Sequence, residues 1–229
     1  MITDAVIPAL DEAQNIGRVV ESLAPFGLRR VVVCDNGSTD GTGDVARAAG
    51  AEVVLEPQRG YGAACLAGLA HLRRDPPDTV LFLDGDGADD VRRVPDLLAP
   101  IEQGWADMVI GSRTLGRAAP GAITPVQKFG NVLSSTLVSA FFKVKFTDLG
   151  PFRSISWDGL ERLEMADRDF GWTVEMQAKA ARRGLRCAEI PVDAHVRMAG
   201  QSKVSGSIKG SVKAGVKILY TIGREALRR

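Results

Sequence analysis

The chain has 229 residues, of which 45% are hydrophobic and 25% are charged, and its formal net charge is +1. This length suffices for one domain with a complete hydrophobic core, and the composition excludes a largely disordered chain. The near-zero net charge gives the molecule no overall attraction for polyanions, so nucleic acid is not an expected partner.

The first half of the chain alternates short apolar runs with helical patterns. Strands are predicted over residues 5–7, 31–34, 52–55, 79–83 and 107–110. Helices are predicted between them, including one with Asp11 as its N-cap and one over residues 61–72. Continuously apolar strands that alternate with helices indicate an α/β fold, in which helices cover both faces of a mostly parallel sheet.

The second half has a less regular pattern. A connection rich in glycine and proline, 116–125, precedes a segment over 126–146 that mixes apolar residues with serines. A strand-like turn is predicted within 147–156, a helix over 172–183 and a strand over 187–190. Because no internal repeat or domain boundary is visible, we expect one domain over 1–206 and a C-terminal helix over 207–229 as part of it.

The C-terminal segment is basic and has helical periodicity. Seven basic residues but only one acid, Glu225, follow residue 202. Apolar and basic positions at helical spacing are Ile208, Val212, Val216, Leu219 and Ile222, beside Lys209, Lys213 and Lys217. A basic amphipathic helix is typical of proteins that lie on an anionic membrane surface. A helix docked on its own domain, with its lysines in water, explains the pattern equally well.

Carboxylates follow two of the predicted strands at their carboxyl ends, where ligands bind in parallel sheets. Asp84 and Asp86 come after the strand over 79–83, and Asp35 follows the strand over 31–34. Mg²⁺ is typically held by one or two carboxylates together with substrate phosphates. Aspartate and glycine also form turns readily, so the Asp-Gly-Asp motif has little weight alone. Asp40 or Thr42 is expected to cap the next helix.

Seven short motifs extend along nearly the whole chain. They are IPALDE at 7–12, CDNGSTDGT at 34–42, RGYGAA at 59–64, FLDGDG at 82–87, GSR at 111–113, DLGPFRSI at 148–155 and IPVDAHVRMAGQSKVSG at 190–206. In this order they resemble the family 2 glycosyltransferases of the GT-A fold, and within that family the dolichyl- and polyprenyl-phosphate sugar synthases. The resemblance implies a metal-dependent hexosyltransferase that uses a UDP- or GDP-linked sugar as donor.

The resemblance also implies roles for individual residues. The residues it assigns to the nucleotide sugar are Pro8, Leu10, Glu12, Asp35, Gly60, Asp84, Gly85 and Asp86. Asp84 and Asp86 are expected to hold Mg²⁺ or Mn²⁺. The residues expected to contact phosphates are Arg113, Arg197, Ser202 and Lys203. A solvated basic loop is the alternative for the last three. Asp86 and Arg113 are predicted to act in catalysis by supporting the departing diphosphate, in a single displacement that inverts the anomeric carbon.

The acceptor is the least defined part of this prediction. A hydroxyl acceptor needs a general base, for which the nearest candidates are Asp167, Asp169 and Glu175; of these we assign Glu175, although it could equally be structural. A phosphate acceptor is already ionised and needs only positioning, which favours a polyprenyl or dolichyl phosphate. The segment around Val132 and Phe142 could then form a second helix at a membrane surface, with core packing as the alternative.

Other enzyme classes fit the sequence less well. A sugar nucleotidyltransferase remains an alternative, although the glycine-rich basic loop expected near residue 10 is absent. The GxGxxG motif of a dinucleotide-dependent oxidoreductase is absent after the first strand. Three dispersed cysteines, no signal-peptide pattern and no run of about 18 apolar residues predict a cytoplasmic protein. Peripheral attachment to the inner face of the cell membrane stays open.

Overall fold

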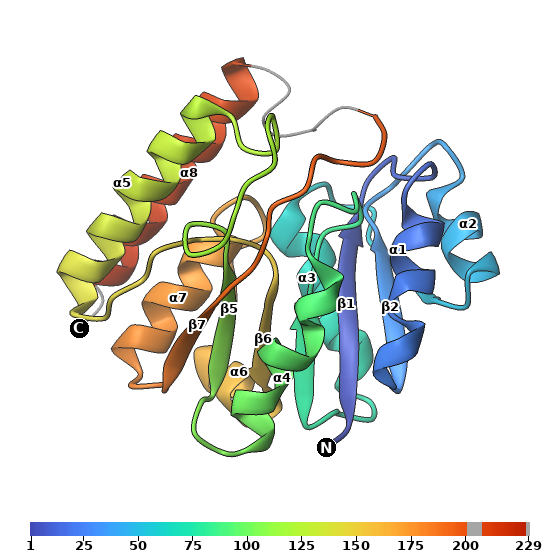
Figure 1. The fold of residues 1–229 in the computed structure, drawn as a ribbon, viewed down its shortest axis with the longest axis horizontal. Coiled ribbons are helices and arrows are strands. Elements are labelled where there is room, and N and C mark those ends of the chain that lie inside the picture. Colours follow the sequence, from blue (N-terminus) through green and yellow to red (C-terminus); the bar gives the residue numbers. More distant parts are fainter. Residues whose placement is uncertain (201–207, 228–229) are drawn as a thin grey trace.

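The computed structural model describes residues 1–200 and 208–227, which contain one seven-stranded sheet (Figure 1). The strands are β1 (Thr3–Ala9), β2 (Arg30–Asp35), β3 (Glu52–Leu55), β4 (Thr79–Phe82), β5 (Met108–Ser112), β6 (Arg153–Ser156) and β7 (Cys187–Pro191). Their order in the sheet is β3-β2-β1-β4-β6-β5-β7. Strand β6 is antiparallel to β4 and β5, and all other pairings are parallel. The prediction of a mostly parallel sheet is therefore confirmed.

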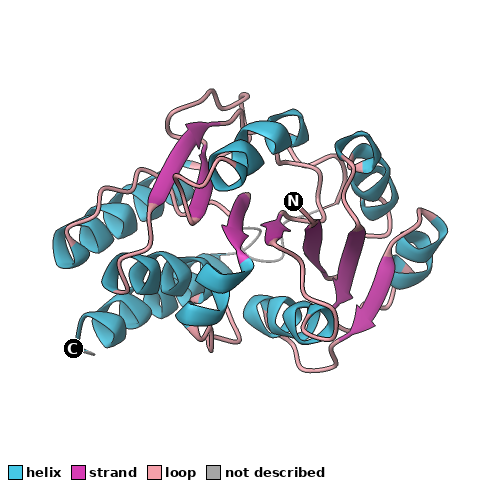
Figure 2. Cartoon of the chain, turned by 90° about the horizontal axis from the view of Figure 1, so that it is seen from below, coloured by secondary structure: helices cyan, strands magenta, loops and turns pink. Residues whose placement is uncertain are grey.

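Helices cover both faces of this sheet, as predicted (Figure 2). They are α1 (Ile16–Ser22), α2 (Thr42–Ala48), α3 (Tyr61–Leu72), α4 (Val94–Glu102), α5 (Pro125–Phe142), α6 (Trp157–Leu163), α7 (Trp172–Arg182) and α8 (Ile208–Leu227), with short 3₁₀ turns at Ala24–Phe26 and Val91–Arg93. Helices α1, α2 and α4 enclose one hydrophobic core with the sheet, and α3, α6 and α7 enclose the other. The continuously apolar strands are buried on both faces because each face has its own helical layer.

Helices α5 and α8 lie side by side outside this second layer (Figure 1). Both contact α7, and both reach the core beneath: Val138 and Ile222 are buried in it, and Leu137, Phe142 and Ile218 pack against it. The C-terminal helix predicted from the sequence is thus present, and it packs on the rest of the fold.

Local predictions differ from the structure at three places. Helix α1 begins after Asn15, and Asp11 instead has a left-handed backbone (φ 50°) and accepts a hydrogen bond from the Thr39 backbone amide at 2.9 Å. The N-cap of α2 is Gly41, while the Asp40 carboxylate accepts a hydrogen bond from the backbone amide of Thr42. Helix α6 was not predicted, since seven residues are too few to show a clear helical period.

Candidate functional site

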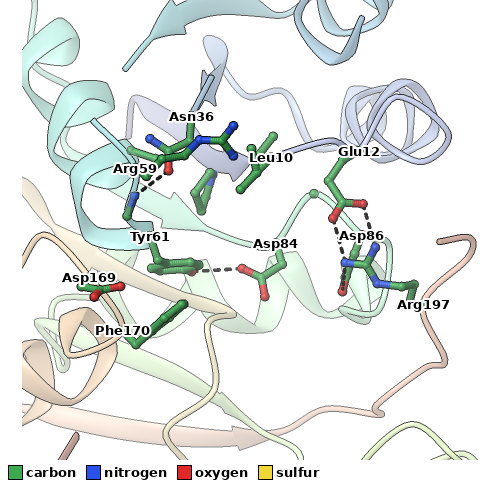
Figure 3. Close-up of a pocket in the computed structure, with 15 residues that line it drawn as sticks. Leu10, Glu12, Asn36, Arg59, Tyr61, Asp84, Asp86, Asp169, Phe170 and Arg197 are labelled. Carbon is green, nitrogen blue, oxygen red and sulfur yellow. Dashed lines mark hydrogen bonds and ion pairs between the residues drawn. The ribbon is translucent and has the colours of Figure 1, made fainter. Parts of the chain in front are cut away.

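A cavity of about 320 Å³ opens at the carboxyl ends of the central strands (Figure 3). Strands β1, β2 and β4 are neighbours in the sheet, and the loops that follow them converge there. The cavity is lined by Pro8, Ala9, Leu10, Glu12, Asn36, Arg59, Gly60, Tyr61, Ala64, Asp84, Gly85, Asp86, Asp169, Phe170 and Arg197. Eight of the residues predicted from the sequence are among them: Pro8, Leu10, Glu12, Gly60, Asp84, Gly85, Asp86 and Arg197.

Asp84 is held at the floor of the cavity by two contacts. The Tyr61 hydroxyl donates a hydrogen bond to Asp84 Oδ1 at 3.0 Å, and the Asp84 backbone amide donates one to Asp89 Oδ2 at 2.9 Å. Burial, followed by the nearby charges of Asp89 and Asp86, raises the pKa of Asp84 well above its ordinary value. Burial likewise raises the pKa of Asp89 to about 7. Burial and the close approach of three carboxylates in one loop therefore favour the protonated forms of Asp84 and Asp89.

The sequence predicts a divalent cation beside these carboxylates. Among residues 1–200 and 208–227, no group of three or more His, Cys, Asp or Glu side chains is arranged to hold a metal ion. Two carboxylates suffice for Mg²⁺ when substrate phosphates complete its coordination. Asp84 and Asp86 provide that minimal set, and the charge of a cation would oppose both the burial and the neighbouring carboxylates that raise the pKa of Asp84. The residues present therefore fit a metal that is bound together with a phosphate-containing ligand.

An ion cluster closes one side of the cavity. The Arg197 guanidinium donates hydrogen bonds to both oxygens of Glu12 at 3.0 and 2.8 Å, and lies 3.3 Å from Asp86 Oδ2 (Figure 3). Arg197 Nε is buried and has no hydrogen-bond partner among the described residues. Because Arg197 contacts carboxylates from the loops after β1 and β4, it joins three distant parts of the chain.

The opposite side of the cavity is organised by Asn36. Its amide nitrogen donates to the carbonyls of Glu56 and Gln58, and its oxygen accepts from the Gly60 backbone amide at 2.7 Å. These bonds hold the loop that carries Arg59 and the first turn of α3. Asn36 was missed as a site residue, although it directly follows Asp35 in the sequence.

Among the remaining lining residues, the sequence analysis missed Arg59, Tyr61, Phe170, Ala9 and Ala64, and it named Asp169 only as a candidate general base. The first two lie in the RGYGAA motif, so the sequence contained a signal for them. Asp169 and Phe170 come from the segment between α6 and α7, more than a hundred residues after the α3 turn that they adjoin. No pattern in the sequence indicates that contact.

Three predicted residues do not line this cavity. Asp35 is buried, and its Oδ1 accepts a hydrogen bond from the Ser38 backbone amide at 2.8 Å. Arg113 forms a two-point ion pair with Asp148, with distances of 2.8 and 2.7 Å. Burial alone would lower the pKa of Arg113, but the bond to Asp148 and the nearby charges of Asp89 and Asp84 raise it. Arg113 is therefore charged and close to the carboxylate loop without forming the wall.

Glu175 is the third of these residues. Its side chain is completely buried in α7, where it accepts hydrogen bonds from the Asp167 backbone amide at 2.7 Å and from Arg224 at 3.0 Å. Lys179 lies 3.0 Å from the same carboxylate. These contacts join α7 to α8 and to the segment before Asp169, which indicates a structural role. Ser202 and Lys203 lie outside the described residues.

Because Glu175 has a structural role, we expect Glu175→Gln to lower the stability of the protein rather than its turnover. The substitution removes the buried charge that faces Lys179 and Arg224, which leaves Lys179 with only the Glu164 carbonyl and Arg224 with only Glu225 among the described residues. This should lower the free energy of unfolding by about 3 kcal/mol. Urea denaturation measures this. Glu161→Gln, which breaks an exposed pair with Arg73, should cost less than about 0.5 kcal/mol. A loss of turnover of about a hundredfold at unchanged stability would instead identify Glu175 as a general base.

Helix α3 approaches the segment 167–170 so closely that only glycine fits at residue 62. A Cβ atom there would overlap the backbone carbonyl of Asp167. We expect Gly62→Ala to displace 167–170 from the cavity wall and to destabilise the protein by about 1–3 kcal/mol, despite the higher helix propensity of alanine. Thermal unfolding measures this effect. Gly223→Ala in α8 is the matched control, because its Cβ meets no atom within 4 Å, and it should leave stability unchanged or raise it.

This chain is similar to known proteins along most of its length. Residues 4–163 match the family model described as glycosyl transferase family 2. An uncharacterized glycosyltransferase of Mycobacterium tuberculosis (strain H37Rv) is 38% identical over 210 residues, which cover 91% of this chain and 92% of that protein. The undecaprenyl-phosphate mannosyltransferase of Micrococcus luteus is 27% identical over 225 residues, which cover 92% and 90%.

Solved structures show the same architecture. Glucosyl-3-phosphoglycerate synthase from M. tuberculosis, in complex with Mn²⁺, UDP and phosphoglyceric acid, superposes with a TM-score of 0.79. The match covers 99% of this chain and 78% of that chain at 21% sequence identity. At this level of identity the likeness establishes the fold.

Proposed function

This chain belongs to glycosyl transferase family 2 and has the GT-A fold, and we propose that its cavity binds a nucleoside-diphosphate sugar whose hexose is transferred to a polyprenyl phosphate. The observation that carries the proposal is the convergence of Asp84, Asp86 and Arg197 at the carboxyl ends of β1 and β4. Carboxylates that fit a divalent cation, beside a half-buried arginine, match the needs of a diphosphate.

The donor is bound by groups from both sides of the cavity. In the proposed complex, Leu10, Asn36 and Arg59 face the nucleoside, while the ion cluster of Glu12 and Arg197 faces the diphosphate. Asp84 and Asp86 would hold Mg²⁺ or Mn²⁺, which when bound neutralises charge on the diphosphate. The glucosyl-3-phosphoglycerate synthase solved in complex with Mn²⁺ and UDP supports this reading of the donor and the metal.

Transfer is a single displacement at the anomeric carbon. An acceptor oxygen forms a bond to that carbon as the bond from the carbon to the diphosphate oxygen breaks, and the nucleoside diphosphate leaves with the electron pair. The chain contributes orientation and fixed positive charge: Arg197 lies beside Asp86, and Arg113 is held rigid by Asp148. Preorganised charges of this kind stabilise a departing anion without further rearrangement. Displacement in one step inverts the configuration.

A lipid phosphate is the proposed acceptor. Its oxygen is already ionised near neutral pH, so no general base is needed. The similarity to an undecaprenyl-phosphate mannosyltransferase along nearly the whole length of both chains supports this acceptor class.

A soluble acceptor is a second candidate, because one observation favours it. Asp169 lines the cavity, and its carboxylate is the kind of group that would serve as general base for a hydroxyl acceptor. The structural neighbour that makes glucosyl-3-phosphoglycerate is named for such an acceptor.

Radiolabel transfer separates these acceptors. The protein is incubated with UDP- or GDP-linked hexoses, Mn²⁺ or Mg²⁺, and either polyprenyl phosphate or 3-phosphoglycerate. We expect label in the lipid fraction, formed only when the metal is present. Label found only in the water-soluble acceptor would replace the lipid with the second candidate. No binding or turnover of any nucleotide sugar would overturn the proposed function.

A further inference from the structure

Helix α5 exposes large apolar side chains along most of its length. Phe129 is 69% exposed and Phe141 is 58% exposed, although both would be expected in a core. Helix α8, which lies beside α5, adds exposed apolar side chains of its own. We name this group the α5–α8 surface: Val126, Phe129, Val132, Phe141, Val216 and Tyr220. An apolar group on two adjacent helices marks an interaction site.

Helix α5 is apolar on more than one side. Its inner side packs on the core through Val138, with Leu137 and Phe142 packed against it. Phe129 and Phe141 are exposed and lie outside that contact. A surface helix that already has an apolar inner side needs no further apolar residues to dock, so these exposed phenylalanines indicate a second, apolar partner.

Exposed lysines accompany this apolar surface. The chain contains 28 acidic and 29 basic residues, yet the segment 108–147, which includes α5, contains five basic residues and no acid. Lys128, Lys143 and Lys145 lie at or near the ends of α5, are exposed, and form no ion pair with any described residue. The apolar surface therefore has a cationic rim.

We propose that the α5–α8 surface binds an anionic lipid bilayer. Apolar side chains insert at the level of the acyl chains while lysines meet the headgroups. A second copy of this chain is a poorer occupant, because a twofold interface would bring the same basic rim against itself. None of the described helices is long and apolar enough to cross a membrane, so the contact proposed is with one leaflet.

The surface adjoins the loop after β5. Asn131 of α5 donates to the Thr114 hydroxyl at 3.3 Å and accepts from the Leu149 backbone amide at 2.9 Å. Thr114 follows Arg113, so a lipid phosphate at the headgroup level would meet the same end of the sheet as the donor. The inference thus deepens the proposed lipid-phosphate acceptor and rests on it.

Vesicle sedimentation tests the inference. The full chain is mixed with vesicles of phosphatidylcholine alone or with phosphatidylglycerol at about 0.1 M salt, where charges are only partly screened. We expect binding to the anionic vesicles, weakened at about 0.5 M salt. The double substitution Phe129→Glu with Phe141→Glu should weaken binding by at least about tenfold, since it removes two inserted side chains. Trp105→Glu is the matched control, because Trp105 is 54% exposed before the opposite end of β5, and it should bind normally.

The remaining results would overturn either the membrane inference or the proposed function. Failure of the unsubstituted protein to bind anionic vesicles, or equal weakening by Trp105→Glu, would overturn the inference. A concentration-dependent dimer that the double substitution abolishes, without vesicle binding, would overturn it in favour of a second copy. Nucleotide-sugar binding, measured without lipid, should be unchanged in the double variant. Absence of that binding in the unsubstituted protein would instead defeat the proposed function, whatever the vesicle result.

Discussion

Asp86→Asn should lower turnover of the nucleotide sugar by about 10²–10³ while leaving the protein folded. Loss of one preorganised charged contact to a developing anion typically costs about 3–4 kcal/mol of barrier. The asparagine oxygen can still accept the hydrogen bond from the Ala88 backbone amide, which Asp86 Oδ1 accepts at 2.9 Å. Because the substitution also removes one of three neighbouring carboxylates, the melting temperature should stay constant or rise.

Radiolabel transfer and thermal unfolding, each with and without Mn²⁺, measure these effects. Mn²⁺ added with the nucleoside diphosphate should raise the melting temperature of the unsubstituted protein and have little effect on the variant. Asp44→Asn is the matched control: Asp44 is exposed and, within the described part of the chain, pairs only with Arg47 in the same helix, so turnover should not change. Near-normal turnover by Asp86→Asn would refute the proposed metal role of this carboxylate.

Arg197→Met should both destabilise the protein and weaken donor binding. The substitution leaves Glu12 buried without its two-point partner, which should cost about 3 kcal/mol of unfolding free energy. It also removes the positive charge that faces the diphosphate. We expect the KM for the nucleotide sugar to rise by at least about tenfold, as expected for loss of a charged hydrogen bond.

A double substitution separates these two effects. Glu12→Gln with Arg197→Met removes the unpaired carboxylate, so most of the lost stability should return, whereas donor binding should stay weak. Urea denaturation and steady-state kinetics on both variants measure how Glu12 and Arg197 interact in stability and in donor binding. If stability and donor binding recover together, Arg197 acts only through the fold and does not contact the diphosphate.

The sequence was informative wherever a functional residue lies at the end of a strand. Apolar runs identify the strands, and the loop after each strand in a parallel sheet faces the ligand edge. Asp84 and Asp86 were predicted in this way, and both line the cavity. Asp35 satisfies the same rule but bonds back into its own turn through the Ser38 amide, and its neighbour Asn36 lines the cavity instead. The end of a strand therefore predicts which loop forms the site more reliably than it predicts which side chain of that loop lines the cavity.

Contacts between distant segments were not predictable. The pairing of Glu12 with Arg197 spans 185 residues, and nothing in either local pattern indicates it. Glu175 was assigned a catalytic role because it is a carboxylate on a late helix, but a buried carboxylate can equally serve as the centre of an ion cluster. Only the positions of Lys179 and Arg224 around it distinguish these two uses.

The sequence by itself determined the α/β class, the mostly parallel sheet and the carboxylate loop after β4, because these follow from local periodicity and from chain direction. The tertiary structure decided which charges meet and which faces stay exposed. Helix α5 illustrates the difference: its residues predicted either core packing or a surface helix, since helical period alone does not say which side is covered. The fold places Ser134 and Ser135 inside and Phe129 outside, a choice made by neighbouring helices that the local sequence does not encode.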